Sequence, residues 1–438
     1  MKKLLFSAVL CLGFCLLGAE YKFELKSNKS WKISVGEEVT FSARLLSRAD
    51  DKSPFLPLKG VTVSCQLVGD GMKTVYKKVV SSDGFVSFTG KLDRPGWIYA
   101  GFYMLDDKGK NFTYKNSAGK STMVYGGIGA LVEPEKLKAG QEEPEDFDAF
   151  WKSQRERLNK VPMKVKLTEI KNHRFKGFKL YDVQVACAGD MPMSGYLTVP
   201  EGAKPKSLPA YVTYQGAGVS SSWTVVAKGA IAMNINAHGI PNGNPREYYV
   251  NLSKGPLKGY WHRNMNDREK IYFNGMYLRV MRSLDFIKSR PEWDGKNLIV
   301  SGSSQGGGQA IAAAALDPQV SLCVAGVAAL SDHAGSLAER QPGWPRFYDA
   351  RGKRKVDPEV VKATAYYDNV FFARRIKCET WLTTGLFDRT CSPAGVYVVY
   401  NNLASAKKEL DVFPAGGHGG APTRKGYQRA RAIMDGKK

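Results

Sequence analysis

The chain is poor in the side chains from which metal centres and disulfide frameworks are built, with 5 histidines and 7 cysteines among 438 residues. Two of these cysteines lie in an N-terminal segment that we expect to be removed. The other five are scattered without metal-ligand spacing, and their odd number leaves at least one free thiol in a monomer. We therefore predict no metal centre. The five cysteines are interpreted as buried packing residues: Cys65, Cys187, Cys323, Cys378 and Cys391.

Long apolar runs are also absent beyond the N-terminus, so no transmembrane segment is predicted. One apolar stretch runs from Leu4 to Leu17, behind Lys2-Lys3 and before Gly18-Ala19-Glu20. It is shorter than the roughly 20 residues that cross a bilayer, and its charged start and small-residue exit are typical of a signal peptide. We expect residues 1–19 to be cleaved and the protein to be secreted, periplasmic or at the cell surface. A lipid anchor on Cys15 is the less favoured alternative, because Phe14 stands where a small residue is needed.

Acidic residues are scarce relative to basic ones, and without residues 1–19 the chain has 62 Lys and Arg against 41 Asp and Glu. Such a charge attracts anionic partners in general, among them uronic-acid-bearing glycans or a bacterial surface. No single run of basic residues stands out, so a lysine-rich solvated surface is the favoured interpretation. We expect no nucleic-acid partner.

The length favours two domains, since a single hydrophobic core rarely grows this large. Short strand-like runs occupy residues 31–35, 61–65 and 96–103, with turn sequences such as Asp70-Gly71 and Asp83-Gly84 between them. We predict a small all-β domain over residues 20–132, an immunoglobulin-like sandwich. Residues 133–145 are polar and rich in Glu, Lys and Gly, and are interpreted as a linker. The remaining residues, 146–438, form the second predicted domain.

This second predicted domain alternates nearly continuous apolar runs with amphipathic stretches. The apolar runs cover residues 210–214, 230–235, 297–300, 322–327 and 380–384, and are typical of parallel strands buried on both faces. Helices are predicted near residues 147–158, 277–287 and 394–404. The sequence therefore predicts an α/β domain with a mostly parallel central sheet.

One predicted strand, Leu298–Ser301, leads into Gly302-Ser303-Ser304-Gln305-Gly306 and then into an alanine-rich helix. A G-x-S-x-G sequence between a buried strand and a helix places its serine on a sharp turn with the hydroxyl exposed. Small neighbours permit that turn, and the first amides of the helix favour developing negative charge. Ser304 is the predicted nucleophile.

A serine hydroxyl needs a base and an acid that orients the base. Where the nucleophile lies on such a turn, acid and base follow it in that order along the chain, which leaves His333 and His418 as candidate bases. His418 lies in a glycine-rich loop after the last predicted strand, whereas His333 comes too early, so His418 is favoured. Asp388, after the strand 380–384, is the favoured acid, and Asp332 is its competitor.

The oxyanion of the tetrahedral intermediate needs two hydrogen-bond donors. The backbone N–H of Gln305, directly after the nucleophile, is the first candidate. The second is an N–H from the loop Tyr214-Gln215-Gly216-Ala217-Gly218, where glycines permit close backbone approach.

These motifs resemble the acetyl xylan esterase and cephalosporin C deacetylase family of carbohydrate esterases. The resemblance covers about Pro144 to Lys438 and rests on five segments: Gly302–Gly308, Gly385–Pro393, Pro414–Gly420, Asp146–Trp151 and Leu208–Tyr214. It implies an α/β-hydrolase that deacetylates xylo-oligosaccharides and small acetyl esters without metal or organic cofactor, with Ser304, Asp388 and His418 as the triad.

The chain departs from the family in two positions and one region. Ala217 stands where the family usually has a tyrosine at the second oxyanion donor, and Gly419 stands where an acidic residue usually follows the histidine. Backbone donation survives at Ala217. Family members commonly lack the β-rich N-terminal region, so their ring-like oligomers are not carried over, and the oligomeric state is left unassigned.

Three aromatic residues could form a platform on which a sugar stacks, namely Tyr260, Trp261 and Trp344, and Tyr214 is a further candidate for contact with the substrate. Core packing is the favoured interpretation for any one of them. An acetylated oligo- or polysaccharide is the predicted substrate. Alternatives are a serine peptidase or another carboxylesterase of the same fold, and a non-catalytic protein whose N-terminal sandwich binds glycan. A structural or interdomain role is favoured for that sandwich.

Overall fold

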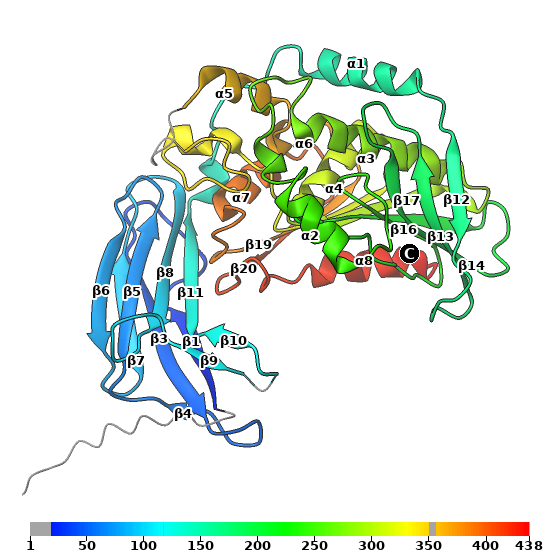
Figure 1. Cartoon of the computed structure of the whole chain (residues 1–438). Helices are drawn as coiled ribbons and strands as arrows, with labels where there is room; N and C mark the ends of the chain where they lie inside the picture. Colours follow the sequence, from blue (N-terminus) through cyan, green and yellow to red (C-terminus); the bar gives the residue numbers. More distant parts are fainter. Residues whose placement is uncertain (1–18, 117, 350–355, 438) are drawn as a thin grey trace, which may run out of the picture.

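The computed structural model describes residues 19–116, 118–349 and 356–437, so the predicted signal peptide lies almost wholly outside the described residues. A β-rich N-terminal region stands beside a larger α/β region (Figure 1). No helix in these ranges is long and apolar enough to cross a membrane.

Two sheets facing each other make up the N-terminal region. One contains β1 (Glu20–Ser27), β3 (Val39–Arg48), β4 (Leu56–Pro57) and β7 (Phe85–Gly90), and the other has the order β2 (Lys32–Ile33), β11 (Tyr125–Val132), β8 (Gly96–Met104), β5 (Thr62–Gly69) and β6 (Val75–Val80). A short hairpin joins β9 (Thr113–Lys115) to β10 (Ser121–Met123). Alternate side chains of β3, such as Val39 and Phe41, are buried between the sheets, as period-2 patterning predicts.

The α/β region is built on a nine-stranded sheet. Its order is β12 (Val165–Glu169), β13 (Phe178–Val185), β14 (Met193–Pro200), β16 (Ile231–Ile235), β15 (Leu208–Tyr214), β17 (Trp293–Ser303), β18 (Leu322–Gly326), β19 (Glu379–Gly385) and β20 (Lys408–Phe413). The pairs from β12 to β16 are antiparallel, and those from β16 to β20 are parallel. The predicted mostly parallel sheet is confirmed.

Helices cover both faces of this sheet. They are α1 (Phe147–Asn159), α2 (Arg246–Lys254), α3 (Tyr272–Lys288), α4 (Gln305–Leu316), α5 (Pro358–Ala365), α6 (Asn369–Ala373), α7 (Pro393–Asn402) and α8 (Arg424–Met434), with short 3₁₀ turns at Pro134–Lys136, Tyr260–His262 and His333–Ala338. Val212 and Val300 belong to the large core that includes α3 and α4, whereas their neighbours Tyr211 and Ile299 pack against α8. Successive side chains of these buried strands thus pack alternately against the helices on one face of the sheet and on the other (Figure 1).

The segment 133–145, interpreted as a linker, is packed against the α/β region. Leu137 is buried, and the side-chain amide of Asn401 donates to the carbonyls of Pro134 and Leu137 at 2.9 and 3.0 Å. The connection between the two regions is therefore held in place by contacts of its own.

Strands β8 and β11 pack directly on the loops that follow β19 and β20. Trp97 belongs to the large core of the α/β region, and its indole N–H donates to the Leu386 carbonyl at 2.8 Å. The N–H of Gly129 donates to the Pro414 carbonyl at 2.9 Å. At Gly127 a Cβ would lie 2.2 Å from the Phe387 ring, so glycine is required for this approach. The N-terminal region thus supports the loops on which Asp388 and His418 lie.

Candidate active site

Ser304 lies between the end of β17 and the start of α4, on a strained turn. Its φ and ψ are 59° and −127°, a conformation that residues other than glycine rarely adopt. A Cβ on Gly302 would lie 2.2 Å from the Gly306 carbonyl oxygen, and one on Gly306 would lie 2.3 Å from the Tyr214 carbonyl oxygen. Both glycines are therefore needed for the tight packing of the turn, as the G-x-S-x-G sequence indicated.

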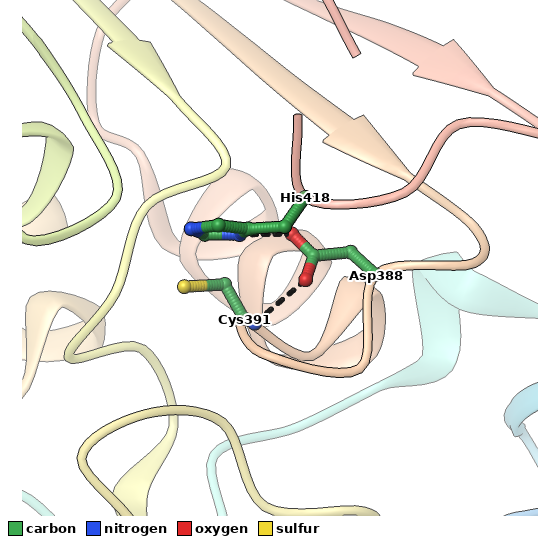
Figure 2. Close-up of side chains that lie close together, drawn as sticks. All are labelled: Asp388, Cys391 and His418. Carbon is green, nitrogen blue, oxygen red and sulfur yellow. Dashed lines mark hydrogen bonds and ion pairs between the residues drawn. The ribbon is translucent and has the colours of Figure 1, made fainter. Parts of the chain in front are cut away.

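The three residues predicted as a triad lie in one hydrogen-bonded chain. The Ser304 Oγ is 3.0 Å from His418 Nε2, and His418 Nδ1 is 2.8 Å from Asp388 Oδ2. With the Nδ1 proton donated to the carboxylate, Nε2 is left as the acceptor for the serine hydroxyl. Figure 2 shows the Asp388 side chain between the imidazole and the backbone of Cys391.

Asp388 is fully buried and its second oxygen is also occupied. Oδ1 accepts the backbone N–H groups of Thr390 at 2.8 Å and Cys391 at 2.9 Å. These donors come from the turn that leads into α7, so the local backbone fixes the carboxylate orientation. The His418 side chain is 33% exposed, so part of the imidazole is accessible from solvent.

The competitors Asp332 and His333 lie in a different buried cluster. Asp332 pairs with Arg340 and accepts the N–H of Gly140 at 2.9 Å, and burial raises the pKa of its carboxyl. His333 faces the Thr364 carbonyl, and burial lowers the pKa of its imidazole to about 4. The structure brings neither residue to Ser304.

The predicted oxyanion loop, residues 214–218, is held by two side-chain amides of α4. The Gln309 amide donates to the Gln215 carbonyl at 2.8 Å, and the Gln305 amide donates to the Gly216 carbonyl at 3.4 Å. Gln305 opens α4, where the backbone N–H groups have no helical acceptor. The loop and the helix start thus lie side by side at Ser304.

His238, which the sequence analysis did not single out, fixes the far end of this loop. Its Nε2 donates to the Gly218 carbonyl at 2.8 Å, and the Tyr272 hydroxyl donates to its Nδ1 at 2.6 Å. Burial lowers the pKa of His238 to about 4, so the neutral imidazole makes both contacts at neutral pH. Its position in the sequence, before Ser304 and outside the motifs considered, gave no signal for this role.

The four aromatic residues predicted as candidates for substrate contact are packed in the interior to different degrees. Tyr214 and Tyr260 are each 1% exposed, and the Tyr260 hydroxyl donates to the Gln305 side-chain oxygen at 2.7 Å. Trp261 and Trp344 are partly buried, with ring centroids 6.2 Å apart. In this structure the Tyr260 hydroxyl holds the side chain of Gln305, the residue after Ser304, and the Tyr260 ring has no free face for a sugar.

A cavity of about 490 Å³ opens beside His418 and Asp388. Its wall includes three aromatic residues of the N-terminal strands and three residues of the α/β region, namely Trp97, Tyr99, Tyr125, Arg346, Phe387 and Arg389. Sequence reasoning missed these lining residues, since their meeting depends on how the two regions pack. A second cavity, of about 410 Å³, is bordered by Ser304, Tyr214 and Trp223.

Asp388, Cys391 and His418 have potential metal-ligand atoms within 4.8 Å of one another (Figure 2). Both carboxylate oxygens of Asp388 and both imidazole nitrogens of His418 already have hydrogen-bond partners, as described above. Burial raises the pKa of the Cys391 thiol well above its ordinary range, which disfavours the thiolate that a metal would need. The donor set therefore fits proton transfer better than metal binding.

Comparisons with known proteins identify the family. The family model described as acetyl xylan esterase (AXE1) matches residues 130–434. The chain is 31% identical over 432 residues to the acetyl esterase Axe7A of Xylanibacter ruminicola, covering 95% of this chain and 93% of that relative.

Solved structures show the same fold. An acetyl xylan esterase from Paenibacillus sp. R4 matches with a TM-score of 0.57 and 26% identity, over 70% of this chain and 99% of its own. Acetyl xylan esterase 1 from Thermoanaerobacterium sp. JW/SL YS485 matches with a TM-score of 0.57 and 24% identity, over 69% of this chain and 96% of its own. The resemblance noted in the sequence is thereby confirmed: the chain belongs to the acetyl xylan esterase family and is a carboxylic ester hydrolase with an α/β-hydrolase fold.

Proposed function

We propose that this enzyme removes acetyl groups from carbohydrate, with acetylated xylan or xylo-oligosaccharide as the substrate, through an acyl-enzyme on Ser304. The observation that carries the proposal is the continuous chain from the Ser304 hydroxyl through His418 to the buried Asp388, with contacts of 3.0 and 2.8 Å. His418 and Asp388 line a cavity of about 490 Å³, which is large enough for a sugar unit, and Ser304 borders the second cavity, of about 410 Å³.

In the acylation step, His418 Nε2 takes the hydroxyl proton while Ser304 Oγ bonds to the acetyl carbonyl carbon. The Asp388 carboxylate stabilises the imidazolium that forms. Backbone N–H groups of Gln305 and Ala217 are the proposed donors to the oxyanion. His418 then protonates the sugar oxygen, the ester C–O bond breaks, and the sugar leaves as an alcohol.

In the deacylation step, water attacks the acetyl carbonyl carbon and gives a proton to His418. Collapse of the second tetrahedral intermediate breaks the bond to Ser304 Oγ, which regains its proton from the imidazolium, and acetate leaves. Every proton movement uses one imidazole, so no resident metal or organic cofactor is invoked. The two steps share one oxyanion site.

We further interpret residues 20–132 as an accessory domain and 146–438 as the catalytic domain. The signal-peptide pattern supports export of the protein, with cleavage before Glu20. N-terminal sequencing of the protein purified from its native host tests this. A mature chain that retains residues 1–19 would contradict it.

Substitution of the nucleophile tests the proposed chemistry. Ser304→Ala should reduce acetate release from acetylated xylo-oligosaccharide by on the order of 10⁴- to 10⁶-fold, because the covalent route is lost. Ser303→Ala is the matched control, since Ser303 is the exposed neighbour on the same turn and should retain most activity. Substantial activity in the Ser304 variant would refute the mechanism.

A substrate panel separates this proposal from the alternatives within the fold. Acetylated xylo-oligosaccharide should be hydrolysed faster than a longer-chain acyl ester or a peptide. Faster cleavage of the peptide would instead identify a serine peptidase.

A further inference from the structure

The outer face of the five-stranded N-terminal sheet carries aromatic side chains beside glycine. Phe102 on β8 and Ile128 on β11 point into the sandwich core, so their neighbours Gly101, Tyr103 and Gly127 lie on the opposite face. Tyr125 is paired with Tyr103 across the two strands and shares that face. A Cβ at Gly127 would lie 2.2 Å from the Phe387 ring, and one at Gly101 would lie 2.9 Å from the Gln66 side-chain amide, so the glycines let these side chains pack directly on the sheet beside the tyrosines.

This face continues into the cavity beside His418. Tyr125 lines the cavity, and its ring centroid is 6.3 Å from that of Phe387, which precedes Asp388 in the chain. The Arg389 guanidinium donates to the Tyr103 hydroxyl at 2.8 Å and lies over the Phe387 ring at 5.4 Å. The tyrosines of the sheet and the loop of the catalytic acid therefore form one surface.

The surface extends away from the catalytic residues along β5 and β6. The Gln66 amide donates to the Tyr103 hydroxyl at 2.6 Å, and Tyr76 is paired with Gln66 across the strands. In Figure 1, β11 is the long strand of this sheet nearest the α/β region and β6 is the farthest. We call Tyr125, Tyr103, Gln66 and Tyr76, together with Arg389, the tyrosine strip.

The strip has the chemistry that sugar rings require. Tyr125 is 51% exposed and Tyr76 is 71% exposed, so both rings can offer a face to the C–H groups of a pyranose. The Tyr103 and Tyr125 rings are nearly parallel, with an interplanar angle of 10° and centroids 6.0 Å apart. Planar amide and guanidinium groups beside them can bond sugar hydroxyls.

We propose that the tyrosine strip is a glycan subsite supplied by the N-terminal region, which binds the sugar chain that extends from the acetylated residue at Ser304. This inference rests on the proposed deacetylase function and goes beyond it. It assigns the N-terminal region a role in substrate length: the preferred substrate is an oligomer or polymer that reaches from the catalytic residues to Tyr125 and, when long enough, to Tyr76.

Kinetics on substrates of different length test the strip in the full chain. The measured quantity is the ratio of kcat/KM for a long acetylated xylo-oligosaccharide to kcat/KM for p-nitrophenyl acetate. Tyr125→Ala should lower this ratio about three- to tenfold, mainly through KM, because a stacking contact is lost. Tyr76→Ala should lower it only for oligosaccharides long enough to cross the sheet.

Phe85→Ala is the matched control, because Phe85 is a 49% exposed aromatic residue of the other N-terminal sheet. Its ratio should equal that of the unchanged protein. The glycan-subsite proposal is overturned if Tyr125→Ala leaves the ratio unchanged, or if Phe85→Ala lowers the ratio equally. The glycan-subsite proposal is also overturned if Tyr125→Ala leaves the ratio unchanged but converts a dimer to a monomer in sedimentation. That result would show that this face binds a second copy of the chain.

Failure of the strip can be told apart from failure of the proposed function. If Ser304→Ala leaves p-nitrophenyl acetate hydrolysis intact, the catalytic assignment is wrong. If that activity is lost and the length ratio is still insensitive to Tyr125→Ala, only the subsite is wrong. Binding of an acetylated xylo-oligosaccharide to the Ser304→Ala protein, measured by calorimetry with and without Tyr125→Ala, gives a readout that does not need turnover. Weaker binding in the double variant supports the strip, and equal binding overturns it.

Discussion

Asp388 and Asp332 are both buried carboxylates that follow parallel strands of the same sheet, yet their partners differ. Asp388 accepts from His418 and from two backbone N–H groups, whereas Asp332 pairs with Arg340. The sequence could rank these two acids by strand order, but it could not show that Arg340 lies next to one of them.

Neutralising each acid should therefore have a different consequence. Asp388→Asn should lower kcat by about 10³- to 10⁴-fold, because the imidazolium loses its counter-charge and the tautomer is no longer fixed. Asp332→Asn should instead lower the free energy of unfolding by about 3–5 kcal/mol, because it leaves the buried Arg340 without its partner. Thermal unfolding and kcat per folded molecule, measured on both variants, check this. The assignment of Asp388 as the acid is wrong if Asp332→Asn lowers kcat and Asp388→Asn lowers only the free energy of unfolding.

His238 gives the protein a dependence on pH that can be predicted with its sign. Its folded pKa of about 4 lies below the ordinary value of 6.5, so its contribution to stability is complete above pH 6.5 and is lost as the pH falls toward 4. His238→Gln removes that titration. The difference in free energy of unfolding between the unchanged protein and the variant should shrink by up to about 3 kcal/mol between pH 7 and pH 4.

Urea unfolding of both proteins at pH 7 and at pH 4 measures this difference, and groups that titrate alike in both proteins cancel. If the difference in free energy of unfolding stays constant or increases from pH 7 to pH 4, His238 is not a buried neutral imidazole.

The strand–turn–helix element around Ser304 depends on the absence of a side chain at Gly306. A Cβ there would lie 2.3 Å from the Tyr214 backbone oxygen, which cannot move without shifting β15. Gly306→Ala should cost about 3 kcal/mol of stability and at least tenfold in kcat, because the turn and the oxyanion loop are displaced.

Gly275→Ala is the control within another helix. A Cβ at Gly275 of α3 would meet only the end of the Arg279 side chain, at 3.3 Å, so the change should be neutral or stabilise by up to about 1 kcal/mol. Calorimetric melting temperatures and kcat decide between these outcomes. Equal effects of the two substitutions would show that the turn is not unusually tight.

The buried strands and the helices that follow them are the part of the molecule that the sequence predicted well. Continuous apolar runs identified the parallel strands, and the α7 helix at Pro393–Asn402 agrees closely with the predicted 394–404. Local chemistry explains this success, because a glycine-rich turn between a buried strand and a helix has few alternatives. By contrast, the support of the oxyanion loop by Gln309 and His238 depends on contacts between distant segments.

The whole molecule is held together by a core that crosses between its two regions. Trp97 of β8 packs into the core of the α/β region and bonds the Leu386 carbonyl, two residues before Asp388. No sequence pattern in either region identifies this contact, because an isolated tryptophan in a strand would be predicted to pack in the core of the sandwich. The cavity wall formed by N-terminal aromatic residues could not be predicted for the same reason.

Truncation of Trp97 should therefore affect both stability and catalysis. Trp97→Ala should cost about 3–5 kcal/mol, and kcat of the folded protein should fall roughly fivefold because the loop before Asp388 loses its support. Phe102→Ala, in the same strand but facing the sandwich core, should cost a similar amount of stability and leave kcat unchanged. Denaturant unfolding with activity measured on the folded fraction checks both. Equal kcat values in the two variants would contradict a supporting role for Trp97.

The central claim is that Ser304 becomes acylated during turnover. It is tested most directly by mixing the enzyme with excess activated acetyl ester, quenching in acid within the first turnovers, and measuring the mass of the peptide that contains residue 304. We expect one added acetyl group on Ser304 that disappears once substrate is exhausted and never forms in Ser304→Ala. Hydrolysis without any acetylated peptide, or an acetyl group on another residue that forms and decays at the rate of turnover, would contradict it.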